Sequence, residues 1–152
     1  MKATRIRDLA GLCVVAAVAA WLLVRSFYGS LPPISVVAGA SLYPVALGEV
    51  VLGFYVRARI ADRRVGDGPH QLHPITAARA LALAKASALV GAAVTGVWIG
   101  FLLHIAPMAS TVRAASEDRA GAVVGLIAGI ALVASAVWLE QCCRAPKDNH
   151  EA

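Results

Sequence analysis

The sequence predicts an all-α integral membrane protein, a four-helix bundle with both its N-terminus and its C-terminus in the cytoplasm. Hydrophobic residues make up 59% of the 152 residues and charged residues only 15%, a balance far from that of a soluble domain. Four apolar runs approach the roughly 20 residues that a helical span needs, and short polar or proline-bearing stretches separate them. We therefore predict one transmembrane domain over residues 1–152.

The first two spans are predicted at about 8–28 and 34–57. The first contains 16 uncharged residues between Asp8 and Arg25. It lacks the small-residue cleavage site of a secretory signal, so we expect it to remain as a helix. Two adjacent prolines mark the turn after it. The second span contains Pro44, where a kink is expected.

The last two spans are predicted at about 76–105 and 120–140. Residues 58–75 are charged and contain glycine and proline, so they form a cytoplasmic loop between two helical hairpins. Residues 145–152 have the composition of a disordered tail. The chain therefore crosses the membrane four times.

The distribution of Lys and Arg predicts the orientation of the spans. These residues accumulate on the cytoplasmic side of bacterial membranes. One side of the predicted bundle carries Lys2, Arg5, Arg7, Arg57, Arg59, Arg63, Arg64, Arg79, Lys85, Arg144 and Lys147, against Arg25, Arg113 and Arg119 on the other. Anchoring to anionic lipid headgroups accounts for the formal charge of +5, and no nucleic-acid partner is needed.

Rows of small residues predict how the last two spans pack. Helices in lipid associate through close van der Waals contact and polar bonds, because burial in place of lipid gains little. The third span carries Ala88, Ala92, Gly96 and Gly100, and the fourth carries Gly121, Gly125 and Gly129. We expect the two helices to pack as an antiparallel hairpin. The alternative is that one row is a docking surface for a second copy or another membrane protein.

Glu49 is an acid within the second apolar run. It precedes Arg57 by eight residues, or roughly 12 Å of helix, and Lys85 enters the membrane from the same side. We predict an intramembrane Glu49–Lys85 pair, with Arg79 as a substitute partner. The pair has three interpretations: a structural contact that sets helix register, a proton or ion pathway, or a polar contact to a partner or lipid headgroup.

The sequence predicts no catalytic residues, no metal site and no cofactor. No Ser, Cys or Thr accompanies a His in a pattern that suggests nucleophilic attack, so we expect that the protein is not an enzyme. His70 and His73 form an HxxH pair in the loop without a third ligand. Cys142 and Cys143 lack the CxxC spacing of a redox or metal pair.

Two segments carry a family resemblance. LHPITAARALALAKASALVGAAVTGVWIGFLL and WLEQCCRAP resemble the bacterial membrane family of domain of unknown function 3180. The matching positions are Ala77, Ala78, Arg79, Ala84, Lys85, Ala86 and Ser87, then Leu139, Glu140, Cys143, Arg144 and Pro146. The TRIRDLAG start and VLGFYVRARI also fit, so the resemblance covers nearly the whole chain.

The resemblance implies an actinobacterial plasma-membrane protein with four spans, often encoded near folate-biosynthesis genes, and no established activity. It draws attention to a cytoplasmic rim, which comprises Arg79, Glu140, Cys143 and Arg144. We predict a small accessory or scaffold subunit in the bacterial plasma membrane that binds another membrane protein or copies of itself. The alternative is a small transporter or channel component that uses Glu49 and Lys85 in a polar or proton path.

Overall fold

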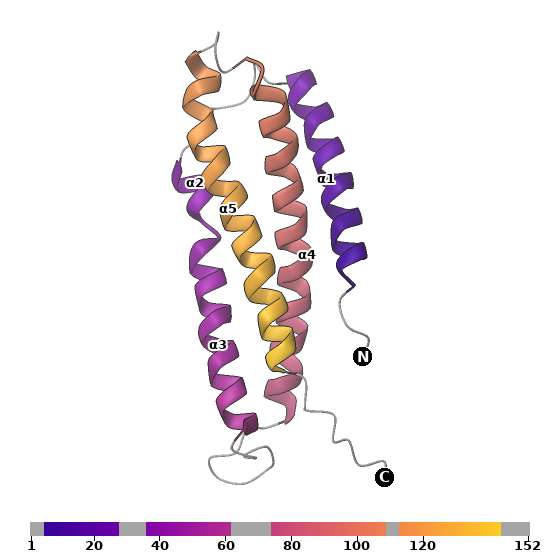
Figure 1. Cartoon of the computed structure of the whole chain (residues 1–152), viewed down its shortest axis with the longest axis vertical. Helices are drawn as coiled ribbons and strands as arrows, with labels where there is room; N and C mark the ends of the chain where they lie inside the picture. Colours follow the sequence, from indigo (N-terminus) through magenta and orange to yellow (C-terminus); the bar gives the residue numbers. More distant parts are fainter. Residues whose placement is uncertain (1–4, 28–35, 62–73, 109–112, 144–152) are drawn as a thin grey trace.

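The computed structural model describes residues 5–27, 36–61, 74–108 and 113–143. Every secondary-structure element in these ranges is helical. The helices are α1 (Ile6–Phe27), α2 (Val36–Ala40), α3 (Tyr43–Ala61), α4 (Pro74–Ile105) and α5 (Arg113–Cys142). Helices α1 and α4 run in one direction, and α2, α3 and α5 run in the opposite direction (Figure 1). The end of α3, the start of α4 and the end of α5 lie at one end of the molecule, which we call the basal end, and α1 starts farther from that end (Figure 1).

The centre of the fold is the antiparallel pair of α4 and α5. The helix α1 packs against α4, while α2 and α3 pack against α5, so the helices lie side by side in the order α1, α4, α5, α3 (Figure 1). The contact between α3 and α4 is slight. The predicted four-helix bundle is therefore an open arrangement in which α1 and α3 flank a central hairpin.

Within the residues that the structure describes, three segments are long and apolar enough to cross a membrane, and they lie in α1, α4 and α5. The predicted second span is different, because it is divided into the short α2 and the longer α3. Three charged residues, Glu49, Arg57 and Arg59, lie within the 19 residues of α3. The described residues therefore contain three candidate spans and one broken helix, where the sequence predicted four spans with a kink in the second.

The break at Ser41 and Leu42 has a local cause. A proline ring inside a helix clashes with the carbonyl four residues earlier and removes one backbone donor. For Pro44 that carbonyl belongs to Ala40, the last residue of α2. Pro44 instead lies in the first turn of α3, where a missing N–H costs little. The kink predicted near Pro44 is thus a complete interruption just before it.

Small clusters of buried side chains run along the central pair. Near the end of α1, Val24 packs with Phe101, Ile105 and Ala122. Further along, Leu9 packs with Ala88, Ala92 and Ala136, and at the basal end Val56 packs with Ala80. Many large apolar side chains of α1 and α3 remain exposed, as expected for helices that contact lipid.

The glycines of α4 pack against two different helices, α1 and α5. A side chain at Gly96 or Gly100 would collide with backbone atoms of α1, at Cys13 and Ala17 respectively. Gly91, which the sequence analysis did not single out, faces Gly129 and Val133 of α5. The row predicted to face α5 therefore turns toward α1 at its later glycines, because a four-residue repeat drifts around a helix of 3.6 residues per turn.

The glycines of α5 lie against α4 and α2. A side chain at Gly125 would collide with the indole ring of Trp98, and one at Gly129 would lie 2.7 Å from the hydroxyl oxygen of Thr95. Gly39 of α2 lies against the backbone of Gly121 and Gly125. These glycines thus allow close approach between elements of the same chain.

Candidate functional site

The buried carboxylate of Glu49 defines the candidate site. Its side chain is 2% exposed, and its Oε2 accepts a hydrogen bond of 2.9 Å from the Ser135 hydroxyl of α5. Its other oxygen, Oε1, is buried and has no hydrogen-bond partner within the described ranges. An acid in this setting is costly unless its hydrogen bonds are complete. Glu49 therefore either fixes the position of α3 against α5 or interacts with a proton, an ion or a partner.

Ser135 has more acceptors than hydrogens. Its Oγ lies 2.9 Å from Oε2 of Glu49 and also 2.9 Å from the carbonyl oxygen of Leu132. A serine hydroxyl has one hydrogen, so it can donate fully to only one of these acceptors at a time. The Glu49 carboxylate and the Leu132 carbonyl therefore compete for this one hydrogen.

The described partner of the Glu49 carboxylate is Ser135, and Lys85 lies on α4 close to the level of Glu49. Val56 of α3 and Ala80 of α4 pack in one cluster, and the two helices are antiparallel. Seven residues before Val56 and seven residues after Ala80 therefore lie at the same level, which places Glu49 level with Ser87. Lys85 is two residues, or roughly 3 Å, from that level. It is half-buried on α4, whereas Glu49 reaches α5. The Glu49–Lys85 pair stays a prediction.

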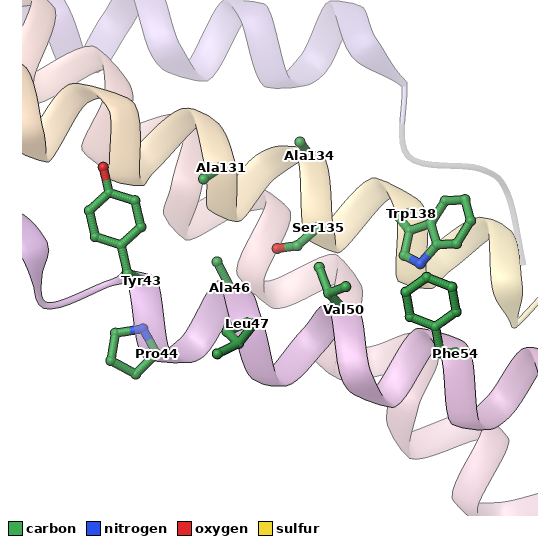
Figure 2. Close-up of a pocket in the computed structure, with 10 residues that line it drawn as sticks. All are labelled: Tyr43, Pro44, Ala46, Leu47, Val50, Phe54, Ala131, Ala134, Ser135 and Trp138. Carbon is green, nitrogen blue, oxygen red and sulfur yellow. The ribbon is translucent and has the colours of Figure 1, made fainter.

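An apolar groove runs beside this contact between α3 and α5, and we call it the α3–α5 groove (Figure 2). Its volume is about 860 Å³. The walls include Tyr43, Leu47, Val50 and Phe54 of α3, with Ala131, Ser135 and Trp138 of α5. Figure 2 shows the Ser135 hydroxyl directed toward α3 and the rings of Phe54 and Trp138 at the basal end of the groove. Those ring centroids are 5.7 Å apart.

Both ends of the groove have defined polar contacts. The Tyr43 hydroxyl donates a hydrogen bond of 3.4 Å to the carbonyl oxygen of Val124. At the other end the guanidinium carbon of Arg57 lies 5.5 Å from the centre of the Trp138 ring. Such a cation–π contact holds an arginine side chain against an aromatic face. The groove thus runs from a helix break to an exposed cation.

A second, smaller hollow lies between α2 and α4, and we call it the α2–α4 recess. Its volume is about 300 Å³, and Gly39, Ser41, Leu42, Val97 and Trp98 contribute to its walls. The helix break therefore forms one wall of this recess.

The cytoplasmic rim predicted from the sequence is partly described. Arg79 is exposed, Glu140 is 4% exposed and Cys143 packs against the cluster of Val56 and Ala80, all at the basal end. Burial raises the pKa of the Cys143 thiol, and the neighbouring Cys142 raises it further. Arg144 lies outside the described residues, as do His70 and His73, loop residues 62–73 and tail residues 145–152.

The parts of the chain with described positions contain no group of three His, Cys, Asp or Glu side chains arranged to hold a metal ion. Ser135 is the residue of the candidate site that sequence reasoning missed. It was detectable in principle, because serines in apolar spans commonly form hydrogen bonds between helices.

This fold, with three helices able to cross a membrane, indicates an integral membrane protein. The chain matches the family described as "Protein of unknown function (DUF3180)" over residues 9–147, and it belongs to that family. The comparison confirms the resemblance seen in the sequence. Neither a curated protein nor a solved structure matches the chain.

Proposed function

We propose that the protein is an accessory or scaffold subunit that binds another membrane protein through the α2–α4 recess. The supporting observation is the helix break at Ser41 and Leu42. Gly39 contacts Gly125, which is seven residues, or roughly 10 Å, from the start of the apolar span at Asp118. The break therefore lies beside the apolar part of α5, which in the proposed arrangement is within the hydrocarbon layer.

Non-helical backbone within the hydrocarbon layer must be covered by something other than lipid. Lipid offers no hydrogen bonds, so non-helical segments in membranes occur where protein or a water-filled cavity covers them. Ser41 is exposed on the single chain, and Leu42 is half-buried. A transmembrane helix of another subunit, or of a second copy, would cover this segment. Because Val97 is also exposed at the recess, a partner would gain apolar contact there.

The proposed setting is the bacterial plasma membrane, with the basal end in the cytoplasm. The excess of Lys and Arg at the chain ends and in the central loop supports this orientation. Reporter domains fused after α5 and between α3 and α4 should both be active in the cytoplasm. Activity of either fusion on the outer side would contradict the orientation.

Partner binding is tested by purifying the tagged protein from its native membrane in mild detergent and measuring its mass by native mass spectrometry. We expect a second protein, or a second copy, in fixed ratio. Ser41→Trp would fill the recess and should remove that partner. Leu23→Trp, on an exposed face of α1, is the matched control and should retain it. A wild-type chain recovered alone would overturn the proposal, as would equal retention by both variants.

A second candidate function is proton or ion transfer through Glu49, with Lys85 in the same polar path. The unpartnered Oε1 and the two acceptors around the Ser135 hydroxyl favour it. Protein reconstituted in vesicles should then carry a flux of protons or cations, and Glu49→Gln should abolish that flux. Ser26→Ala, which removes an exposed hydroxyl from α1, should leave the flux unchanged. Equal flux with Glu49→Gln would eliminate this candidate.

A further inference from the structure

The α3–α5 groove has the polarity of a hydrocarbon site. Two of its hydroxyl groups are already engaged, because Tyr43 donates to Val124 and Ser135 contacts Glu49 and Leu132. The remaining walls are almost entirely apolar. An occupant that fits this surface is therefore itself apolar along most of its length.

The length of the groove corresponds to one leaflet of a bilayer. Tyr43 and Phe54 both line it and are eleven residues apart on α3, which is roughly 16 Å of helix. The hydrocarbon core of a bilayer is about 30 Å thick, so one leaflet contributes about 15 Å. An acyl chain of one leaflet lies along the membrane normal over this distance. The lining residues are spaced along α3 and α5, so the groove runs parallel to these helices (Figure 2).

The basal end of the groove carries a fixed positive charge. Arg57 follows Phe54 by three residues and is exposed, and its contact with Trp138 holds the guanidinium beside the two rings that close the groove. Guanidinium groups bind phosphate through paired hydrogen bonds, and basic residues at the membrane surface attract anionic headgroups. A cation at one end of an apolar slot is complementary to a phospholipid.

We propose that the α3–α5 groove binds one acyl chain of an anionic phospholipid whose phosphate contacts Arg57. The lipid covers the exposed apolar side chains between α3 and α5 and lies against the helix that bears Glu49. This site does not depend on partner binding, because the α2–α4 recess is built from different residues. Its test and the test of the proposed function can therefore fail separately.

The experiment is native mass spectrometry of the purified full chain in detergent, titrated with phosphatidylglycerol or with phosphatidylcholine of the same acyl chains. We expect the first bound lipid to be phosphatidylglycerol, with higher affinity than phosphatidylcholine. Arg57→Gln should weaken phosphatidylglycerol binding about tenfold, the effect expected when a charge-assisted hydrogen bond to the phosphate is lost. Arg59→Gln is the matched control, because Arg59 lies over Tyr55, which does not line the groove, whereas Arg57 lies over Trp138, which does; Arg59→Gln should change binding little.

A second variant tests the groove itself. Ala131→Phe places a ring in the groove and should remove the first bound lipid, whereas Ala120→Phe, on an exposed part of the same helix, should retain it. Equal affinity for the two lipids would overturn the proposal. Equal losses of phosphatidylglycerol affinity in Arg57→Gln and Arg59→Gln would overturn it as well. A change in oligomeric mass with Ala131→Phe, at unchanged lipid binding, would assign the groove to protein contact and also overturn it. If Ala131→Phe does not fold, the comparison of the two arginine variants still decides.

Discussion

The Ser135 hydroxyl and the Glu49 carboxylate lie 2.9 Å apart across the interface of α3 and α5. Both side chains are buried, and 86 positions separate them in the chain. The contact therefore joins the broken helix to the central pair with a directional bond, where apolar contacts alone would permit sliding.

Removing the Ser135 hydroxyl should destabilise the protein. Ser135→Ala leaves a buried carboxylate without its described hydrogen bond, so we expect a loss of about 1–2 kcal/mol in the free energy of unfolding. Chemical unfolding in detergent, followed by the loss of helical circular dichroism, measures it. Ser26→Ala is the control, because the Ser26 hydroxyl is exposed and bonds the Leu22 carbonyl of its own helix. Equal effects of the two substitutions would show that the contact contributes nothing specific.

The two residues should also be energetically coupled. In a Glu49→Leu background the carboxylate is absent, so Ser135→Ala should cost much less than in the wild-type chain. We expect a coupling free energy of about 0.5–2 kcal/mol from the complete double-mutant cycle, measured by the same unfolding experiment. Additive effects would mean that the hydroxyl stabilises α5 through Leu132 alone.

Enlarging a glycine between α1 and α4 should destabilise the protein. Gly100→Ala would place a methyl group against the backbone of Ala17, which cannot rotate away, so α1 must shift. We expect a loss of about 1–3 kcal/mol in the free energy of unfolding. Gly11→Ala is the matched control on α1, because nothing lies within 4 Å of the added carbon. It should be neutral or stabilising by about 0.5–1 kcal/mol, since glycine weakens helices. Similar losses in both variants would contradict the close contact at Gly100.

The sequence was sufficient to predict the helices but not which helix each face contacts. The spans in α1, α4 and α5 follow from long apolar runs, whose length and composition are local properties. A helix that is apolar on all sides gives little indication of its inner face. The contact of Gly96 with α1 instead of α5 therefore required the positions of both neighbouring helices.

At the candidate site, likewise, the sequence indicated one residue of the contact but not its partner on another helix. An acid in an apolar run drew attention to Glu49, because a charge in lipid is costly, and its side chain is buried in the structure. The hydrogen-bond partner of Glu49 could not be predicted from charge complementarity, because Ser135 is neutral. It also lies on α5, whereas the sequence prediction compared the depth of Glu49 only with that of basic residues on α4. The break before Pro44 was underestimated, because its size depends on how α2 and α3 each pack against α5.

The thiol of Cys143 should react slowly at neutral pH. Burial raises its pKa above the ordinary value of 9.0, and a raised pKa leaves less of the reactive thiolate at pH 7. The test uses the Cys13→Ser, Cys142→Ser variant, in which burial still acts on Cys143. Its rate of alkylation by iodoacetamide should continue to rise beyond the pH at which a free thiol, the single cysteine of an unstructured uncharged peptide, reaches its maximum rate. Mass spectrometry of samples quenched over time gives the rate at each pH. A maximum reached at the same pH as the free thiol, or below it, would show that the end of α5 is more open than the packing of Cys143 against Val56 and Ala80 implies.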